Sequence, residues 1–156
     1  MRIGQGIDVH RVGDDPARPL WLGLVHVPDA PGLVGHSDAD VATHALCDAL
    51  LGAAGLGDLG RHFPDTDPAF AGAPSRRLLE AVVELVRAAG YAVTSGDVTI
   101  VAERPKLVLY LPAMSHELSS VAGAPISVKA TTSEGLGALG RVEGIAASAV
   151  VLLSAS

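Results

Sequence analysis

The sequence predicts one domain that mixes β-strands with α-helices. The chain has 156 residues, a length that fits a single domain with a sizeable core, so we expect residues 1–156 to fold as one unit. Strand-like apolar segments occur near both ends of the chain. Two segments between them repeat apolar residues at spacings of three and four, as amphipathic helices do. The sequence shows no internal repeat or low-complexity tract.

The first strands are expected at residues 2–9 and 20–27. Gly13, Pro16 and Pro19 mark the connection between them, because glycine and proline favour turns. A connection of this kind allows the two strands to pair as a hairpin.

A first helix is expected from Ala39 to about Ala54, with Ser37 or Asp38 as its N-cap. Its other edge is polar, so we expect an amphipathic helix. The apolar residues that recur at helical spacing are Val41, Ala42, Ala45, Leu46, Ala49, Leu50 and Ala53.

The remaining elements follow the same rules. A second helix is expected from a Ser75 cap to Gly90, and a short helix after Pro112. Later strands are expected at DVTIVAE, ISVKATT and GIAASAVVLL, which are residues 97–103, 126–132 and 144–153. The long connection over residues 56–74 lacks periodicity, and its aspartates, glycines and prolines indicate a functional loop rather than a linker.

The charge balance disfavours nucleic acid as a partner. The net charge is −6, with 17 acidic against 11 basic residues, and no cluster of lysines and arginines occurs. Aromatic residues make up only 3%, so platforms for stacking bases are also lacking. An anionic substrate would be repelled at long range unless bound cations reversed the local potential.

Cysteine usage and hydropathy predict a cytoplasmic protein. The single Cys47 cannot form an intrachain disulfide, and we expect it to be a buried apolar residue in a reducing compartment. The N-terminal segment lacks the apolar core of a signal peptide. No run approaches the ~18 apolar residues that a membrane span requires, so we expect no membrane association.

Asp8 and His10 lie two residues apart in the first strand, so their side chains project to the same face. On the first helix Asp40, His44 and Asp48 share one stripe at spacings of four. Asp8, His10 and His44 together would make a catalytic zinc site, which takes three protein ligands and leaves the fourth position open. The alternatives are a solvated strand end for the pair and a polar helix margin for His44.

His36 and Ser37 precede the first helix directly. Free backbone N–H groups and the positive end of the dipole favour phosphate at such a position. Simple capping by Ser37, with His36 as a loop residue, would also explain the pair.

Several longer motifs together resemble one enzyme family over nearly the whole chain. They are RIGQGIDVHR, GHSDADVATHALCDALLGAAGLGDLGRHFPDTDP, ERPKL and VKATTSEGLGALGRVEGIA. The most specific part of the resemblance is the long central motif. Its His-Ser-Asp start, its helical histidine and its FPDTDP ending occur in the order and spacing of the family. The sequence is similar to the 2-C-methyl-D-erythritol 2,4-cyclodiphosphate synthases of the non-mevalonate isoprenoid pathway.

This resemblance implies a compact α+β domain, a mixed sheet with helices packed on one face, and a homotrimer with active sites between neighbouring subunits. The implied enzyme is a lyase. It would convert 4-diphosphocytidyl-2-C-methyl-D-erythritol 2-phosphate to 2-C-methyl-D-erythritol 2,4-cyclodiphosphate. The 2-phosphate would attack the β-phosphorus and CMP would leave, with assistance from bound metals.

The resemblance also implies roles for individual residues. His36 and Thr132 would stabilise the transition state. Glu134 would help to hold a second divalent cation, Mg²⁺ or Mn²⁺, that arrives with the substrate. One Zn²⁺ per subunit would be held by Asp8, His10 and His44.

Substrate contacts are implied in four regions. The metal side contributes Asp8, Val9, His10, His36 and Ser37. The long connection contributes Asp58, Leu59, Gly60, Phe63, Pro64, Asp65, Thr66 and Asp67. The cytidine pocket would be formed by Ala102, Glu103, Arg104, Pro105, Lys106, Leu107 and Val108. The last region contributes Thr131, Thr132, Ser133, Glu134, Ala138 and Arg141.

Arg141 and Glu143 match positions near the trimer axis, where some family members hold an isoprenoid diphosphate in an apolar cavity. Ala138 stands where the familiar pattern has an aromatic residue. A weaker or different axial ligand is therefore expected.

Two other functions remain open from the residues alone. A zinc phosphohydrolase would use the same three ligands to activate water. A nucleotide-binding module could carry the zinc as a structural ion, although structural sites are usually closed by four protein ligands.

Overall fold

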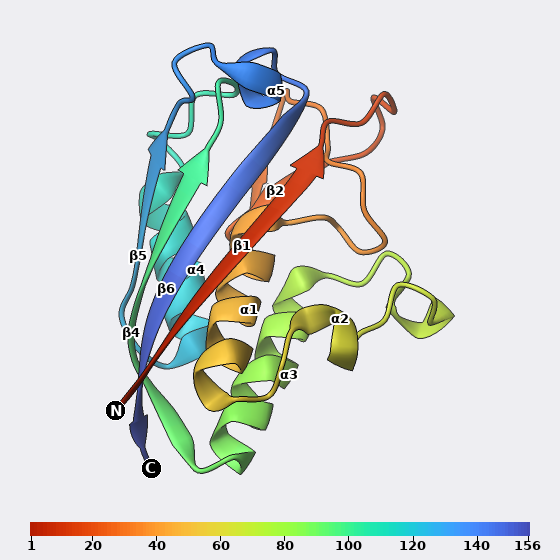
Figure 1. Cartoon of the computed structure of the whole chain (residues 1–156). Coiled ribbons are helices and arrows are strands. Elements are labelled where there is room, and N and C mark those ends of the chain that lie inside the picture. The colour runs from red at the N-terminus through yellow and green to blue at the C-terminus, as the bar shows by residue number, and fades with distance from the viewer.

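The computed structural model describes residues 1–156 and shows a mixed sheet with helices on one face (Figure 1). The sheet order is β1-β6-β4-β5. β6 runs antiparallel to both β1 and β4, whereas β4 and β5 are parallel. The four strands are β1 (Arg2–Arg11), β4 (Tyr91–Val101), β5 (Ile126–Thr131) and β6 (Gly144–Ala155). The prediction of a mixed sheet with helices on one face is therefore confirmed.

Three helices cover the sheet: α1 lies against β1 and β6, α4 lies against β5, and α3 packs on α1 (Figure 1). Their bounds are α1 (Val41–Ala54), α3 (Ser75–Ala88) and α4 (Leu111–Ala122). Short helical turns lie in the connections, namely α2 (Leu59–His62), the 3₁₀ turn η1 (Pro68–Phe70) and α5 (Gly137–Gly140). None of the helices is long and apolar enough to span a membrane.

The expected hairpin between residues 2–9 and 20–27 is wrong. β1 pairs instead with β6 along ten residues, from Arg2 opposite Leu153 to Arg11 opposite Gly144. Residues 20–27 form a separate small hairpin of β2 (Leu20–Leu22) and β3 (Val25–Val27). The chain reverses between them because Gly23 and Leu24 both adopt positive φ, at 56° and 65°. The long apolar β6 offers β1 many more ladder hydrogen bonds than three-residue strands could.

Helix α1 is buried nearly all round, so the expected polar edge is wrong. It lies between the sheet and α3, and even its Thr43 and His44 are buried. Its N-cap is Asp40, whose side chain accepts a hydrogen bond from Thr43 N at 3.0 Å. Ser37 and Asp38, which were expected to cap the helix, lie in the loop before it. Cys47 is fully buried within α1, as expected.

Two glycines let β1 lie directly on α1. A Cβ atom added at Gly4 would lie 2.0 Å from Ala49 O, and one at Gly6 would lie 2.1 Å from Ala45 O. Real side chains cannot approach so closely, so these positions require glycine. The contact brings the end of β1, with Asp8 and His10, beside the first turns of α1.

The later elements agree with the expectations except at their boundaries. α3 ends at Ala88 and Gly90 follows with φ 84°, as its position predicts. β4 begins at Tyr91 rather than at residue 97, and α4 includes Pro112 in its first turn. Pro74, not Ser75, occupies the N-cap position of α3, because Ser75 is already helical, and the Ser75 side chain bonds Asp38 instead.

The face of the sheet away from the helices carries exposed apolar residues. On β6, residues that point to the helices are buried, namely Ile145, Ala147, Ala149, Val151 and Leu153. On the opposite face Ile3, Ile7 and Val9 of β1 are 74%, 61% and 57% exposed, and Val150 of β6 is 42% exposed. A sheet with one bare apolar face is typical of a subunit that associates with other chains.

Candidate active site

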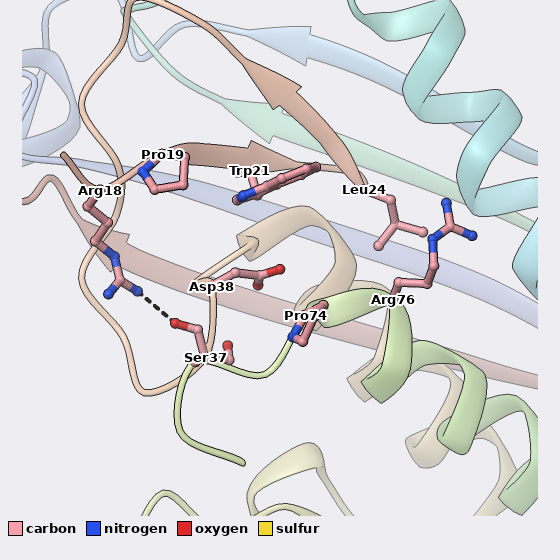
Figure 2. A pocket seen from close by; sticks show the side chains of 9 residues that line it. Arg18, Pro19, Trp21, Leu24, Ser37, Asp38, Pro74 and Arg76 are labelled. Carbon is pink, nitrogen blue, oxygen red and sulfur yellow. Dashed lines mark hydrogen bonds between the residues drawn. The ribbon is translucent and has the colours of Figure 1, made fainter.

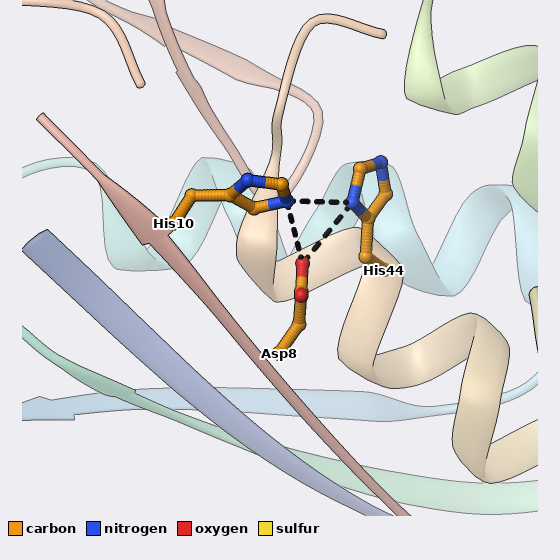
Figure 3. A group of neighbouring side chains, drawn as sticks. All are labelled: Asp8, His10 and His44. Atoms are coloured by element: carbon orange, nitrogen blue, oxygen red, sulfur yellow. Dashed lines mark hydrogen bonds and ion pairs between the residues drawn. The ribbon is translucent and has the colours of Figure 1, made fainter. Parts of the chain in front are cut away.

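Asp8, His10 and His44 converge on one point between β1 and α1 (Figure 3). Asp8 Oδ2 lies 3.0 Å from His10 Nε2 and 3.1 Å from His44 Nδ1. The two ring nitrogens lie 3.4 Å apart. The sheet alternation places Asp8 and His10 on the α1 side, and the buried helix presents His44 to them. The structure thus brings together the three residues proposed as metal ligands.

The ring orientation of His10 is set by a backbone carbonyl. His10 Nδ1 lies 2.8 Å from Val34 O. A carbonyl oxygen only accepts, so Nδ1 carries the proton and Nε2 presents its lone pair to Asp8 and His44. The loop before α1 therefore selects the ligating nitrogen of a residue on β1.

Asp8 Oδ2, His10 Nε2 and His44 Nδ1 each direct a lone pair to the same point. A cation or shared protons must therefore lie between them. Burial alone raises the pKa of the Asp8 carboxyl, but hydrogen bonds and charge interactions with His10 and His44 hold that pKa well below its usual value. Burial lowers the pKa of His10, but the hydrogen bond to Asp8, the negative charge of Asp8 and the hydrogen bond to Val34 O together raise that pKa above its ordinary value. Two imidazole nitrogens and one carboxylate oxygen are a donor set that fits Zn²⁺ with one position left open.

A cavity of about 550 Å³ opens beside the three ligands. It gathers many of the residues expected from the sequence: Asp8, His10, His36, Ser37, His44, Leu59, Gly60, Phe63, Pro64 and Asp65. Asp58, Thr66 and Asp67 lie in the same loop but do not line the cavity. Val9 projects from the other face of β1, away from it. The cavity is also lined by four residues that no sequence pattern assigned to it, namely Gly35, Asp48, Phe70 and Leu78.

Asp40 and Asp48, the other members of the helical stripe, have different positions. Asp40 is fully buried and holds Gly23 N and Leu24 N, each at 2.8 Å, so it serves the fold. Asp48 lines the cavity and accepts a hydrogen bond from Leu59 N at 2.7 Å. Burial raises the pKa of Asp48, and the charges of Asp58 and Asp8 add to this rise.

The connection over residues 56–74 is ordered by its aspartates. Asp58 caps α2 by accepting from Arg61 N at 2.9 Å, and Asp67 accepts from Ala69 N at 2.9 Å. His36 Nε2 donates to Asp67 O at 3.0 Å. This bond ties the start of the α1 loop to the long connection.

The remaining expected residues, over 102–108 and 131–141, form a second group at the ends of β4 and β5. Glu103 Oε1 holds Ser133, and Thr132 Oγ1 donates to Glu134 Oε1 at 3.4 Å. Arg141 and Glu143 form an ion pair, and Ala138 is exposed. None of these residues lines the cavity at the metal ligands.

The sheet itself separates the two groups within one chain. Val9, Ala146, Val101 and Thr131 lie in one row across the sheet. Three strand spacings separate Val9 from Thr131, which is roughly 14 Å. A single chain therefore holds the two groups at opposite edges of its sheet.

A second cavity, of about 390 Å³, is lined in part by Ser37 and Asp38 (Figure 2). Arg18, Trp21, Pro74 and Arg76 are among its lining residues. Its arginines have partners already: Arg76 pairs with Glu117, and Arg18 donates to loop carbonyls, including Ser37 O at 2.7 Å. No sequence motif pointed to Arg18, because its role depends on a loop that only folding brings to it.

Comparisons with known proteins agree with this geometry. A protein of Trichlorobacter lovleyi named 2-C-methyl-D-erythritol 2,4-cyclodiphosphate synthase is 56% identical over 156 residues, covering 98% of both chains. One of the same name from Symbiobacterium thermophilum is 57% identical over 157 residues, covering 99% of both.

Solved structures give the same result. The structure of a 2-C-methyl-D-erythritol 2,4-cyclodiphosphate synthase with bound CDP matches with a TM-score of 0.88 and 41% identity, covering 98% of this chain and 100% of that one. The bifunctional IspDF of Campylobacter jejuni matches with a TM-score of 0.94 and 42% identity, covering 99% of this chain. This chain spans only 42% of that longer protein. Residues 1–154 match the sequence profile of the YgbB family. The chain therefore belongs to the YgbB family.

Proposed function

We propose that this chain catalyses the ring closure for which its relatives are named. In 4-diphosphocytidyl-2-C-methyl-D-erythritol 2-phosphate, an oxygen of the 2-phosphate bonds to the β-phosphorus. The bond from that phosphorus to the CMP oxygen breaks, which yields 2-C-methyl-D-erythritol 2,4-cyclodiphosphate and CMP. The observation that carries the proposal is the convergence of Asp8, His10 and His44 beside an open cavity, in a chain with 57% identity to a synthase of that name.

The chain's own residues have distinct tasks in this reaction. Asp8, His10 and His44 would hold Zn²⁺, and Glu134 would help to hold Mg²⁺ or Mn²⁺. When bound, these cations offset the negative charge of the diphosphate and of the transition state. His36 and Thr132 would help to stabilise the transition state. The ordered connection over residues 58–67 surrounds the methylerythritol hydroxyls, and residues 102–108 bind the cytidine. Alignment of the two phosphates accounts for most of the rate.

We propose that a homotrimer completes the active site. One subunit would provide the metal side and the loop over residues 58–67, and its neighbour would provide residues 102–108 and 131–134. The separation of these groups within one chain supports this arrangement. The bare apolar face of the sheet supplies a surface for a head-to-tail interface that closes by cyclic symmetry.

The shared site can be tested by mixing two inactive variants, His44→Ala and Thr132→Val. A site built from the intact halves of two different subunits would be active. When equal amounts mix at random, about one quarter of all sites combine two intact halves. We therefore expect about one quarter of wild-type activity after joint refolding. Activity that stays at the level of the separate variants would contradict a site between subunits.

The zinc phosphohydrolase is the second candidate, because the same ligands can activate water. Turnover in ¹⁸O-labelled water separates the two reactions. Ring closure consumes no water, so the product is a cyclic diphosphate without label. Labelled linear phosphate would establish hydrolysis instead.

A structural role for the metal is the third candidate. The open cavity beside only three ligands favours a catalytic ion, because structural sites are usually closed. His44→Ala should therefore abolish turnover but lower the free energy of unfolding only slightly. Equal loss of both would favour the structural ion.

An isoprenoid diphosphate on the trimer axis is a further proposal. Arg141, although paired with Glu143, has an exposed side chain that could contact a diphosphate. Ala138 provides little apolar surface there. A crystal of the trimer soaked with geranyl diphosphate should show the ligand beside Arg141, and the absence of density would exclude it.

A further inference from the structure

Ser75, the first residue of α3, lies between the metal ligand His44 and the side chain of Asp38. Ser75 Oγ donates to Asp38 Oδ1 and lies 3.0 Å from His44 Nε2. Ser75 is fully buried, and His44 is only 8% exposed. The three side chains come from three segments: the loop before α1, α1 itself and α3. Ser75 Oγ thus connects His44 Nε2, the ring nitrogen that does not face Asp8, to the carboxylate of Asp38.

The donor and the acceptor can be assigned for each hydrogen bond between His44, Ser75 and Asp38. A carboxylate only accepts, so the single hydroxyl proton of Ser75 is directed at Asp38. At His44 the Ser75 oxygen is therefore the acceptor, and Nε2 carries the imidazole proton. Ser37 Oγ, at 3.2 Å, is a second acceptor for the same proton. The Nδ1 lone pair of His44 is then free to face Asp8 and His10.

We propose that Asp38 and Ser75 are positioning residues of the metal centre, which act through His44 by holding its proton on Nε2 and its lone pair on the metal side. The inference rests on the proposed metal site, and it adds two residues that no motif or comparison assigns to it. A metal-ligating histidine usually donates its second N–H to a carboxylate or carbonyl. Here a buried hydroxyl is inserted between the imidazole and the carboxylate.

Asp38 is itself held in place from several sides. Its Oδ2 accepts from Ser75 N at 2.8 Å, its Oδ1 accepts from Asp40 N at 3.3 Å, and its backbone N–H donates to Ala73 O at 3.3 Å. Pro74 offers no side-chain cap, so Asp38 serves the first N–H of α3 across the loop. Asp38 and Ser37 also line the second cavity, which is lined on its other side by Trp21 (Figure 2).

A purely structural role, as a distant cap of α3, makes a different prediction. Loss of a cap lowers the unfolding free energy but does not alter which nitrogen of His44 is protonated. Positioning of His44 lowers zinc affinity in protein that is still folded. The two roles are therefore separable by zinc binding and by the protonation of His44.

Asp38→Asn is the sharpest variant, because it keeps size and shape but adds an N–H donor. The asparagine oxygen can still accept from Ser75 N, while its amide donates to Ser75 Oγ. The Ser75 proton is then directed at His44 Nε2, where it opposes the proton that ligation through Nδ1 requires. We expect zinc affinity, measured by competition with a chromogenic chelator, to fall about 10- to 100-fold.

Two further variants complete the series. Ser75→Ala removes the hydroxyl but leaves Ser37 as an acceptor, so we expect a smaller loss of zinc affinity than in Asp38→Asn. Asp14→Asn makes the same chemical change at an exposed residue and should leave zinc affinity unchanged. Circular dichroism and urea unfolding establish that each variant is folded.

Nitrogen-15 NMR of the zinc-loaded wild-type protein gives a reading that is independent of affinity. We expect His44 to bind through Nδ1 and to carry a slowly exchanging proton on Nε2. Ligation through Nε2 would overturn the proposal. The proposal would also be overturned if folded Asp38→Asn bound zinc within about twofold of the wild-type affinity. If Asp38→Asn does not fold, the same result in Ser75→Ala would overturn it.

The outcomes also separate this inference from the proposed function. If Asp38→Asn keeps its zinc and wild-type protein makes the cyclic product, only the positioning role fails. If wild-type protein binds no zinc, the metal assignment and the positioning role fail together. If zinc affinity falls as expected but no cyclic product forms, the positioning role stands and the proposed reaction fails.

Discussion

Glu103 Oε1 accepts two hydrogen bonds from Ser133, one from its backbone N–H and one from its hydroxyl, each at 2.8 Å. The same oxygen accepts from Gly135 N at 3.2 Å. Between them lies Glu134, whose φ of 54° is unusual for a residue other than glycine. β4 and β5 are parallel, so the segments that follow them meet at one edge of the sheet. Glu103 thus clamps the loop that carries Thr132 and Glu134.

This clamp predicts a pH dependence. Hydrogen bonds from Ser133 and Gly135 lower the pKa of Glu103 below its ordinary value of 4.5. The ionised carboxylate therefore stabilises the folded loop above pH 4.5, and this contribution is lost as the pH falls through the lower folded pKa. The amide proton of Ser133 should titrate with a midpoint below 4.5. A midpoint at or above that value would contradict the clamp.

Glu103→Gln tests the same clamp without a change of pH. The neutral amide accepts more weakly than a carboxylate, so we expect faster hydrogen exchange at Ser133 and Gly135 and a lower kcat. Glu80→Gln, an exposed change on α3, is the matched control. Unchanged exchange in Glu103→Gln would show that the backbone alone holds the loop.

The contact between β1 and α1 predicts a strong effect of one methyl group. Gly6→Ala places a Cβ 2.1 Å from Ala45 O, so the strand and helix must move apart. We expect destabilisation of about 1–3 kcal/mol or more in urea unfolding, and weaker zinc binding because Asp8 and His10 shift.

Gly52→Ala is the control for that change. Gly52 is exposed on α1, and the nearest atom to its added Cβ, Gln5 O, is 4.0 Å away. Alanine has the higher helix propensity, so this variant should be more stable by about 1 kcal/mol. A Gly6→Ala variant as stable as wild type would refute the close contact as a requirement of the fold.

Arg18 supports the loop before α1, so we predict that its replacement weakens the metal site. Its guanidinium donates to the carbonyls of Leu33, Gly35 and Ser37. Lysine keeps the charge but cannot reproduce three bonds from a planar fork. Arg18→Lys should cost about 1–3 kcal/mol of stability by urea unfolding, because partly buried carbonyls lose donors. Zinc affinity should fall as well, since Val34 in this loop orients His10. A variant with unchanged stability and zinc affinity would show that other contacts hold the loop.

The exposed sheet face predicts the assembly state. Ile7→Lys and Val9→Asp would place charges in the proposed interface, where no partner for them is evident, so we expect smaller particles by light scattering and loss of turnover. Ala88→Lys, on the outer side of α3, should leave the mass and the turnover unchanged. Wild-type mass in both sheet variants would exclude this face as the interface.

Local patterns in the sequence predicted most elements and the three residues that converge beside the cavity. Helical spacing located α1, α3 and their ends to within a few residues, because apolar periodicity depends on local geometry. The D-x-H pattern put Asp8 and His10 on one face, because strand side chains alternate. His44 became a candidate through its place on the helix, and the family motifs pointed to the loop residues, of which Leu59, Gly60, Phe63, Pro64 and Asp65 line the cavity.

Tertiary structure decided what depends on partners distant in sequence. β1 pairs with β6 rather than with residues 20–27, since register and ladder length are properties of two strands together. Asp38 and Ser75 were both expected to be caps, and only the packing of α3 on α1 joins them to His44. The sequence by itself determined the elements and the ligand types, because both follow from short-range geometry. The fold alone decided which proton lies on which nitrogen, because hydrogen-bond partners are chosen by packing.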